Sequence, residues 1–398
     1  MSKSVGIVAE YNPFHTGHKY QIDFLKEKGF DTVAVAMSGS CVQRGLPALF
    51  NKHDRAKMAL ENGVSLVAEI PYPFSSMSAE GYAMAGMQTL KALGVDAVCF
   101  GSESGDTQML KEIATFLLSD EYENSLKNYL EHNLPFPTAR EKAIFDKFDL
   151  NKNVVSASND ILAIEYIKAC IKLDWEPEII ALKRKGAGYN QVSEKDGFAS
   201  ASGIRKMISE YRYEQIYKFI PKESTHTMET CLDRGSYFLP DTSWEKAVLF
   251  ALRNKTADDF MQIADCNNEL ANSMEKAAAI SSSVEMLFDN LPTKRYTRAR
   301  LNRIILSAFL DVKNDMPKDI QYIRLLGFNK KGEEFLKVAS KNCHLPISHS
   351  IKILSDKSED CRRLAMAESR ACDMQATFCK FSGEPRQDFI KKLIKVQI

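Results

Sequence analysis

The chain has 398 residues, 44% hydrophobic and 26% charged, and its 53 basic and 52 acidic side chains leave a formal net charge of +1. This composition is typical of a globular protein long enough for two domains, and the balanced charge neither favours nor excludes a nucleic-acid partner. There is no apolar run of about 18 residues, which excludes a transmembrane helix, and no secretion signal is recognisable at the N-terminus.

The first predicted elements are a buried strand and a helix joined by a short polar turn. Residues Val5–Ala9 form an apolar run, Asn12-Pro13 interrupts it, and His15–His18 then opens a helix that Gly29 ends. The sequence His-Thr-Gly-His therefore lies where a strand passes into the N-terminus of a helix.

Two histidines and a glycine at that position favour phosphate binding. Backbone N–H groups and the helix dipole attract an anion, and Gly17 permits close approach because it has no Cβ. Imidazoles can donate hydrogen bonds to a phosphoryl group that gains charge. We predict that His15 and His18 act on a nucleotide phosphate and that the helix itself requires neither side chain. The simpler alternative is that both histidines only cap the helix.

Strand and helix patterns then alternate along the first half of the chain. We expect strands over 32–37, 65–70, 97–100 and 178–182, helices over 54–60, 78–93 and 161–173, and a hydrophilic helical insertion over about 105–150. This order predicts the α/β class with a doubly wound parallel sheet. Ligands bind such sheets beyond the carboxyl ends of the strands, and that rule gathers His15, His18, Ser38, Gly39, Glu69 and Gly101 along one edge.

From about residue 220 onward only helical periodicity is recognisable, without further strands. We therefore predict two domains, an α/β nucleotide-binding domain over 1–220 and a mainly helical domain over 221–398, with the boundary near Pro221. Nine scattered cysteines without a CxxC pair indicate reduced thiols rather than a structural zinc site. We expect a cytoplasmic protein with no metal site of its own, no membrane contact and no evident protein partner.

Four further segments carry polar residues at predicted strand or helix ends. Ser200, Ser202 and Arg205 open a helix and could hold phosphates, although an N-cap followed by a solvated arginine is the alternative. Lys183, Arg184 and Lys185 follow a strand directly and could reach a triphosphate, or form only a solvated basic turn. Asn159 could bond a nucleotide, cap its helix, or do both. The glycine-bounded loop Ser38–Gly45 could face a nucleotide or second substrate, or simply connect two elements.

A basic segment lies farther along the chain, at Thr293–Arg303. Five of its 11 residues are basic and none is acidic: Lys294, Arg295, Arg298, Arg300 and Arg303. At helical spacing Leu301, Ile304 and Ile305 would face a core, while the arginines suit a phosphate backbone and Tyr296 could stack on a base. A solvated helix face is the alternative, and the segment does not distinguish RNA from DNA.

The motifs together resemble the HxGH nucleotidylyltransferase superfamily and, within it, the bacterial tRNA(Met) cytidine acetate ligase family. The resemblance rests on GIVAEYNPFHTGH, MSGSCVQRGLPA, RKGAGY and KRYTRAR, with LLGFN near the C-terminus, and spans residues 5 to about 303 and beyond. Two departures stand out: Ser158-Asn159-Asp160 occupies a position where relatives tend to have Pro-Asn-Asn, and Ser40-Cys41 replaces a more usual Asn-Phe.

The resemblance implies a specific reaction and a specific site. Acetate would be activated with ATP, accompanied by Mg²⁺, to acetyl-adenylate, and the acetyl group passed to the wobble cytidine of elongator tRNA(Met) to give N4-acetylcytidine. His15, His18 and Arg184 would be catalytic, the histidines at the α-phosphate and Arg184 with Ser202 and Arg205 at the pyrophosphate. The implied ATP-binding residues are Val8, Ala9, Glu10, Tyr11, Asn12, Pro13, Phe14, His15, Thr16, Gly17, His18, Lys19, Tyr20, Gln21, Gly101, Asn159, Arg184, Ser202 and Arg205. The implied tRNA-binding residues are Lys294, Arg295, Arg298, Arg300 and Arg303.

Two other functions remain open at this point. A nucleotidyltransferase that joins AMP or CMP to a phosphorylated metabolite would use the same histidines but would not need the basic helical half. A non-catalytic RNA-binding protein could keep the nucleotide fold, but the intact His15, Gly17 and His18 argue against it. The sequence identifies neither the acetate pocket nor a base for the acetyl transfer.

Overall fold

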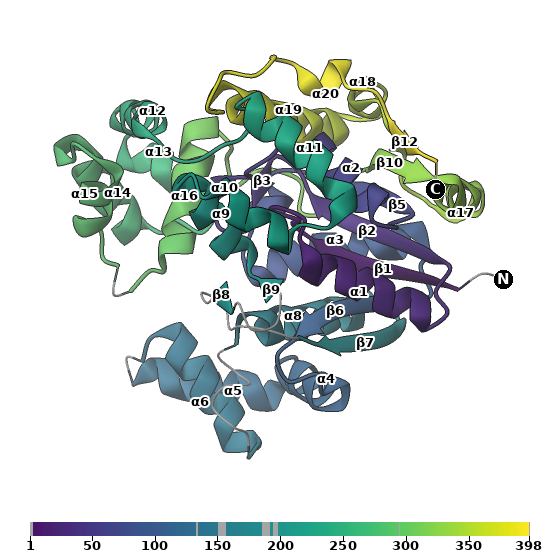
Figure 1. The fold of residues 1–398 in the computed structure, drawn as a ribbon. Helices are drawn as coiled ribbons and strands as arrows, with labels where there is room; N and C mark the ends of the chain where they lie inside the picture. The colour runs from purple at the N-terminus through teal and green to yellow at the C-terminus, as the bar shows by residue number, and fades with distance from the viewer. Residues whose placement is uncertain are drawn as a thin grey trace.

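The computed structural model describes residues 3–132, 134–149, 157–184, 192–193, 198–293 and 295–397. Its centre is an eight-stranded sheet in the order β11-β10-β5-β2-β1-β6-β7, with β12 also paired to β10 (Figure 1). All these strand pairs are parallel except β10 with β5. The strands are β1 Ser4–Ala9, β2 Thr32–Ser38, β3 Cys41–Val42, β4 Leu46–Pro47, β5 Leu66–Ile70, β6 Ala97–Ser102, β7 Glu178–Lys183, β8 Val192–Ser193, β9 Phe198–Ala199, β10 Ile323–Asn329, β11 Ile347–Ser348 and β12 Ile394–Val396.

Helices cover both faces of this sheet. Those before residue 240 are α1 Thr16–Glu27, α2 Lys52–Glu61, α3 Ala79–Leu93, α4 Thr107–Phe116, α5 Asp120–Glu131, α6 Phe136–Lys147, α8 Ser158–Lys172, α9 Ala201–Ser209, α10 Tyr213–Ile216 and α11 Lys222–Asp233. Those after it are α12 Thr242–Arg253, α13 Ala257–Met261, α14 Asn268–Ile280, α15 Val284–Asp289, α16 Arg298–Leu310, α17 Lys330–Asn342, α18 Ile351–Ser355, α19 Glu359–Thr377 and α20 Gln387–Ile390. No helix in the described ranges is long and apolar enough to span a bilayer.

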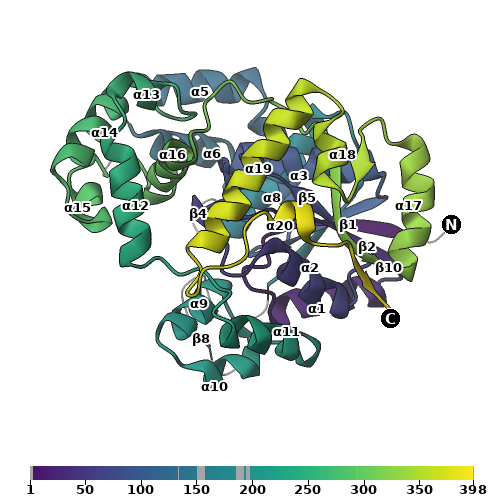
Figure 2. The same cartoon turned by 90° about the horizontal axis from the view of Figure 1, so that it is seen from above.

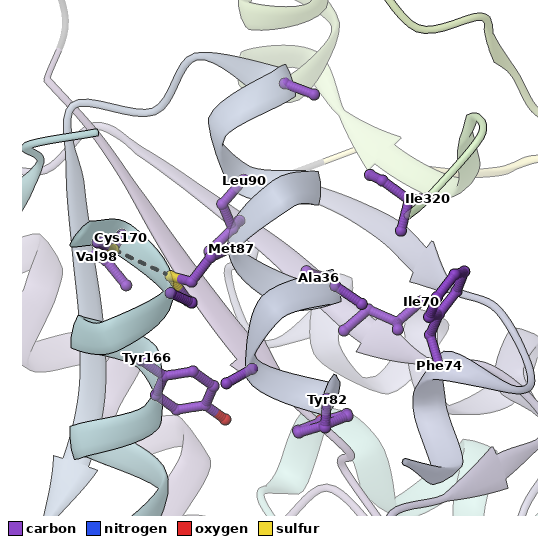
Figure 3. Packing of buried hydrophobic residues seen from close by; sticks show 14 of the residues in the cluster. Ala36, Ile70, Phe74, Tyr82, Met87, Leu90, Val98, Tyr166, Cys170 and Ile320 are labelled. Carbon is purple, nitrogen blue, oxygen red and sulfur yellow. Dashed lines mark hydrogen bonds between the residues drawn. The ribbon is translucent and has the colours of Figure 1, made fainter. Parts of the chain in front are cut away.

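The central strands are apolar almost throughout because both of their faces are buried. Helices α3 and α8 pack on one face, where Tyr82, Met87 and Leu90 of α3 meet side chains of β2, β5 and β6 (Figure 3). A Cβ at Gly6 of β1 would lie 2.7 Å from the Leu90 side chain, so glycine lets Leu90 pack directly on this strand, and a larger residue would force Leu90 to shift. Helices α1 and α2 pack on the other face.

The predicted α/β class and the alternation of strands and helices are confirmed. The expected insertion over 105–150 is also helical, with α4, α5 and α6. The expectation of no strand after about residue 220 is wrong, because β10 pairs antiparallel with β5 and β11 and β12 extend the edge. Short apolar runs such as Ile323–Asn329 have no helical or strand period of their own, so only their sheet partner identifies them.

Two groups of helices project from the sheet. Helices α12–α16 surround a separate apolar cluster that includes Trp244 and Phe260, and α5 and α6 lie apart from them, next to α4 (Figure 1). Helix α19 lies across the molecule between α16 and α18 (Figure 2), and it contacts both. After α16, the C-terminal part of the chain rejoins the sheet through β10, β11 and β12.

A fully buried cluster of charges joins α19 and α20 to the sheet. Lys52 Nζ lies 2.5 Å from Glu69 Oε1, 2.8 Å from Glu368 Oε1 and 2.7 Å from Asp388 Oδ1. Arg324 Nη1 lies 3.1 Å from Glu69 Oε2 and 2.9 Å from Asp388 Oδ1. Buried charges are tolerated only when they are paired in this way, so the cluster fixes the position of both C-terminal helices.

Candidate active site

The two histidines of the His-Thr-Gly-His sequence stack on each other at the start of α1. Their ring centroids are 3.7 Å apart. His15 is the N-cap residue, and its Nδ1 accepts a hydrogen bond from Gly17 N at 3.0 Å. His18 Nδ1 accepts one from His15 N at 3.2 Å, which completes a capping box. The prediction that the helix requires neither side chain is therefore wrong, because both satisfy N–H groups at its first turn.

These two hydrogen bonds also determine which ring nitrogen of each histidine can bind a ligand, and whether it donates or accepts. Each Nδ1 accepts a hydrogen bond from a backbone N–H, so in the neutral ring the proton is on Nε2. Burial, together with the nearby charges of Arg184 and Arg205, lowers the pKa of His15 to about 3. Burial and His15 hold the pKa of His18 well below its usual range. Both rings therefore stay neutral near pH 7 and act as Nε2–H donors, so capping and phosphate binding are compatible roles.

These histidines line a cleft of about 800 Å³, a volume in the usual range for a nucleotide-sized ligand. Fifteen of the implied ATP-binding residues line it: Val8, Ala9, Glu10, Tyr11, Asn12, His15, Gly17, His18, Tyr20, Gln21, Gly101, Asn159, Arg184, Ser202 and Arg205. Pro13, Phe14, Thr16 and Lys19 are not among the lining residues. Phe14 is instead fully buried in the core, and Lys19 pairs with Asp23 on α1.

Arg184 enters the cleft from the end of β7 and is held there by Asn159. Its Nη1 donates to Asn159 Oδ1 at 3.2 Å, and Asn159 Nδ2 donates to Glu103 Oε1 at 2.6 Å. The capping role considered for Asn159 is wrong, because α8 begins after Ala157 without a side-chain cap. Lys183 lines the same cleft, whereas Lys185 and most of the RKGAGY motif lie outside the described residues.

The Ser200–Arg205 segment reaches back to the first turn of the site. Ser200 caps α9 by accepting from Gly203 N at 3.1 Å, and its hydroxyl lies 3.0 Å from that of Ser202. Arg205 Nη1 donates to Asn12 O at 2.6 Å. The alternative of a solvated arginine is therefore wrong, because Arg205 is partly buried and joins α9 to the turn before α1.

Only part of the loop after β2 lines the cleft. Gln43 and Arg44 line the cleft, whereas Ser38 and Gly39 do not. The rule for strand ends predicts Glu69 at the ligand-binding edge, but Glu69 is buried in the charge cluster. Glu69 is at the carboxyl end of β5, as expected. At that position β10 and α20 cover the strand, so no ligand can reach the side chain.

The basic segment borders the same cleft. Thr297, Ala299 and Arg303 line it, so the basic helix and the phosphate site are adjacent. The predicted burial of Leu301, Ile304 and Ile305 is confirmed. Gly45 permits the close contact between the loop after β2 and α16, since a Cβ at this position would lie 2.4 Å from Arg303 N.

Tertiary structure supplies the acids that the basic segment lacks in sequence. Arg295 pairs with Glu269 at 2.5 Å and Arg298 with Glu285 at 2.6 Å, while Arg300 donates to a backbone carbonyl. The suggestion that Tyr296 could stack on a base is wrong for this conformation. The residue is only 4% exposed, and its hydroxyl is hydrogen-bonded to the Asn267 side chain. Lys294 lies outside the described residues.

Several residues of the cleft gave no signal in the sequence. Tyr82 of α3, Leu162 and Tyr166 of α8, and Phe100 of β6 line it, but in sequence each looks like an ordinary core position. Gln43 and Thr297, by contrast, lie in two segments that the sequence had singled out, the loop Ser38–Gly45 and the basic segment Thr293–Arg303. Only the packing of distant elements brings these side chains to one cleft.

A parallel sheet whose first strand leads into a histidine-capped helix, with two arginines at the same cleft, defines the nucleotidyltransferase class of ATP-binding protein. A profile of the HIGH Nucleotidyl Transferase family matches residues 2–387. The tRNA(Met) cytidine acetate ligase of Thermoanaerobacter sp. (strain X514) is 35% identical over 402 residues, which cover 98% of this chain and 99% of that one. The ligase of the same name from Caldicellulosiruptor bescii is 38% identical over 341 residues, 83% of each chain.

Solved structures agree with this relationship. Thermotoga maritima TmcAL bound with alpha-thio ATP is 29% identical and superposes with a TM-score of 0.91 over the full length of both chains. The apo form of the same protein gives a TM-score of 0.93. This chain therefore belongs to the HIGH Nucleotidyl Transferase family and, within it, to the tRNA(Met) cytidine acetate ligases.

Proposed function

We propose that this protein activates acetate with ATP and transfers the acetyl group to the wobble cytidine of elongator tRNA(Met). The observation that carries the proposal is the pair of Nε2–H donors at the start of α1, in one cleft with Arg184, Arg205 and the basic helix α16. Family membership supports the same reaction, since the relatives are named for it. A tRNA substrate would place the protein in the cytoplasm.

In the first half-reaction an acetate oxygen attacks the α-phosphorus of ATP in line. A new phosphorus–oxygen bond forms, the bond to the bridging oxygen breaks, and pyrophosphate departs with its electrons. His15 and His18 would donate Nε2–H groups to the α-phosphate as its charge grows. Arg184, Ser202 and Arg205 would hold the departing pyrophosphate. The chain forms no covalent intermediate in this scheme, so its contribution is orientation and charge stabilisation.

Magnesium would accompany ATP in this reaction. Within the described residues no group of three or more His, Cys, Asp or Glu side chains is placed to hold a metal ion. Magnesium bound to a nucleotide is held mainly by substrate phosphates and water, with few protein carboxylates. The ion would supply further neutralisation of the triphosphate.

In the second half-reaction the N4 amine of cytidine attacks the acetyl carbon of the mixed anhydride and AMP departs. Helix α16 borders the cleft through Ala299 and Arg303, and Thr297 just before it lines the cleft too, so a tRNA bound along its arginines could present a nucleotide to the adenylate. We assign adenylation to residues 1–220, and tRNA binding to the helical part of 221–398, in particular α12–α16.

The test is to incubate the protein with α-labelled ATP, labelled acetate and bulk tRNA, and to digest the RNA to nucleosides. The proposal predicts labelled N4-acetylcytidine together with free labelled AMP, both dependent on ATP. The variant His18→Gln is the matched control and should form neither product. Glutamine at this position preserves the capping box while removing the imidazole. Label in a dinucleotide, with cytidine unmodified, would instead support the nucleotidyltransferase of cofactor type.

A further inference from the structure

A single carboxylate, Glu10, lines the cleft among the described residues that form its wall. It stands just beyond the carboxyl end of β1, next to arginines, tyrosines and the two histidines. A cleft built to bind a triphosphate gains nothing in phosphate affinity from a negative charge. Glu10 counters the effect of burial on the pKa of Arg55 and of Arg205, and this structural role leaves room for a chemical one.

The structure holds Glu10 firmly and leaves one of its oxygens available. Gln43 N donates to Glu10 Oε1 at 3.0 Å, and Arg55 Nη1 donates to the Glu10 carbonyl at 2.6 Å. No donor from the described residues is hydrogen-bonded to Oε2. The next residue, Tyr11, has a φ of 47°, a conformation that turns the chain sharply after Glu10 and before the histidines.

Glu10 is linked both to the phosphate site and to the basic helix. The loop that donates to its carboxylate continues through Arg44 to Gly45, which lies against the backbone of Asn302 and Arg303 in α16. On its other side the chain leads from Glu10 directly into the histidine-capped start of α1. A nucleotide that enters along α16 would therefore meet Glu10 beside an acetyl-adenylate held by the histidines.

The histidines, two tyrosines and the arginines in the described wall of the cleft are poor proton acceptors. Both histidines use Nδ1 to accept from the backbone, and their Nε2 atoms carry protons. Burial raises the pKa of Tyr82 and of Tyr166 well above its usual range, so both phenols stay protonated. The arginines cannot accept a proton at all.

We propose that Glu10 is the base that takes the proton from the cytidine N4 amine during acetyl transfer; the proposal rests on the function proposed above. As N4 attacks, a nitrogen–carbon bond forms and the acyl carbon–oxygen bond to phosphate breaks, with its electron pair going to AMP. The nitrogen then carries one proton too many, and Glu10 Oε2 accepts it and later releases it to water. AMP leaves as an anion and needs no acid.

The experiment compares the two half-reactions in Glu10→Gln, an isosteric change that keeps an oxygen for Gln43 N. Acetate-dependent pyrophosphate–ATP exchange reports adenylation, and single-turnover transfer from preformed acetyl-adenylate to tRNA reports the second step. We expect the ratio of transfer rate to exchange rate to fall about 100-fold or more, the range for loss of a general base. Glu10→Asp should recover part of that ratio. Glu27→Gln, an exposed change on α1, is the control and should leave the ratio unchanged.

Two results would overturn the assignment while leaving the proposed function intact. One is a parallel loss of exchange and transfer, which would mean that Glu10 serves ATP or its Mg²⁺. The other is transfer at the wild-type rate in Glu10→Gln. Failure of the wild-type protein to form N4-acetylcytidine at all would be a different outcome, because it would overturn the proposed function and this role together.

Discussion

Individual side chains at the start of α1 serve the helix and the ligand at once. His15 and His18 satisfy backbone N–H groups with one ring nitrogen and keep the other as a donor. The same hydrogen bonds that stabilise the helix also select the tautomer that a phosphate requires. A substitution at either position therefore tests catalysis cleanly only if it preserves the cap.

We expect His15→Asn to lower acetate-dependent pyrophosphate exchange by about 100-fold or more, the usual effect of removing one preorganised donor. Asparagine is itself a good N-cap, so the melting temperature should stay close to that of the wild type. His15→Ala should lose the same activity and, in addition, about 1 kcal/mol of stability. Thermal denaturation followed by circular dichroism measures the difference. Near-normal exchange in a folded His15→Asn, His18→Gln double variant would contradict the phosphate-binding role.

Among the elements, α16 connects the two halves of the proposed reaction. Its N-terminal end borders the cleft, whereas Arg295 and Arg298 lie outside the cleft, paired with Glu269 and Glu285. All four side chains are well exposed, so each pair is worth little to stability. The acids nevertheless compete with phosphate for the two arginines.

Replacing Arg295 and Arg298 by glutamine should weaken tRNA binding and lower the slope of log K against log salt by roughly 0.7–0.9 for each phosphate that is no longer neutralised. Acetate activation should persist, because neither residue lines the cleft. The matched variant carries Glu269→Gln and Glu285→Gln, which frees the arginines and should strengthen tRNA binding. Titrations at several salt concentrations measure both effects. An unchanged affinity in the arginine variant would mean that this face of the helix is only solvated.

The whole molecule is organised around a sheet to which both ends of the chain contribute. Strand β10 adds residues 323–329 beside β5, and the buried charges join α2, β5, β10, α19 and α20. Glu368 of α19 also accepts from Ser40 N at 2.8 Å and Tyr72 N at 2.6 Å, so it fixes the loops after β2 and β5. The boundary near residue 220 thus separates proposed functions, while the core is shared.

The buried cluster should make stability depend on pH through Glu69. Burial raises its pKa from 4.5 to about 7 against the pull of Lys52 and Arg324. Between these pH values the folded protein keeps a proton that the unfolded chain has released, so the contribution of Glu69 to the free energy of unfolding falls as pH rises. Glu69→Gln mimics the protonated form and should remove this dependence. Urea unfolding at pH 5 and pH 7 should show the wild type losing at least about 1 kcal/mol relative to the variant.

An absent or reversed difference would mean that Glu69 is ionised in the folded protein throughout the range. Lys52→Met provides the contrast, because it leaves three buried carboxylates with one fewer cation and should destabilise the fold by about 3–5 kcal/mol at either pH.

The local sequence by itself determined the elements whose pattern is contained within a few residues. Apolar β-branched runs indicated the strands β1, β2, β5, β6 and β7, and His-Thr-Gly-His after the first strand indicated a phosphate site, because periodicity and helix-end chemistry are local properties. Arg184 and Arg205 were found for the same reason, since each directly follows a strand end or a helix start.

Tertiary structure alone decided which of these segments meet. It placed β10 beside β5, buried Glu69 away from the ligand edge, gave Arg295 and Arg298 acidic partners, and brought α16 to the cleft. Each of these outcomes depends on contacts between residues tens to hundreds of positions apart. Their free energies come from packing and charge pairing in three dimensions, which no local pattern in the chain encodes.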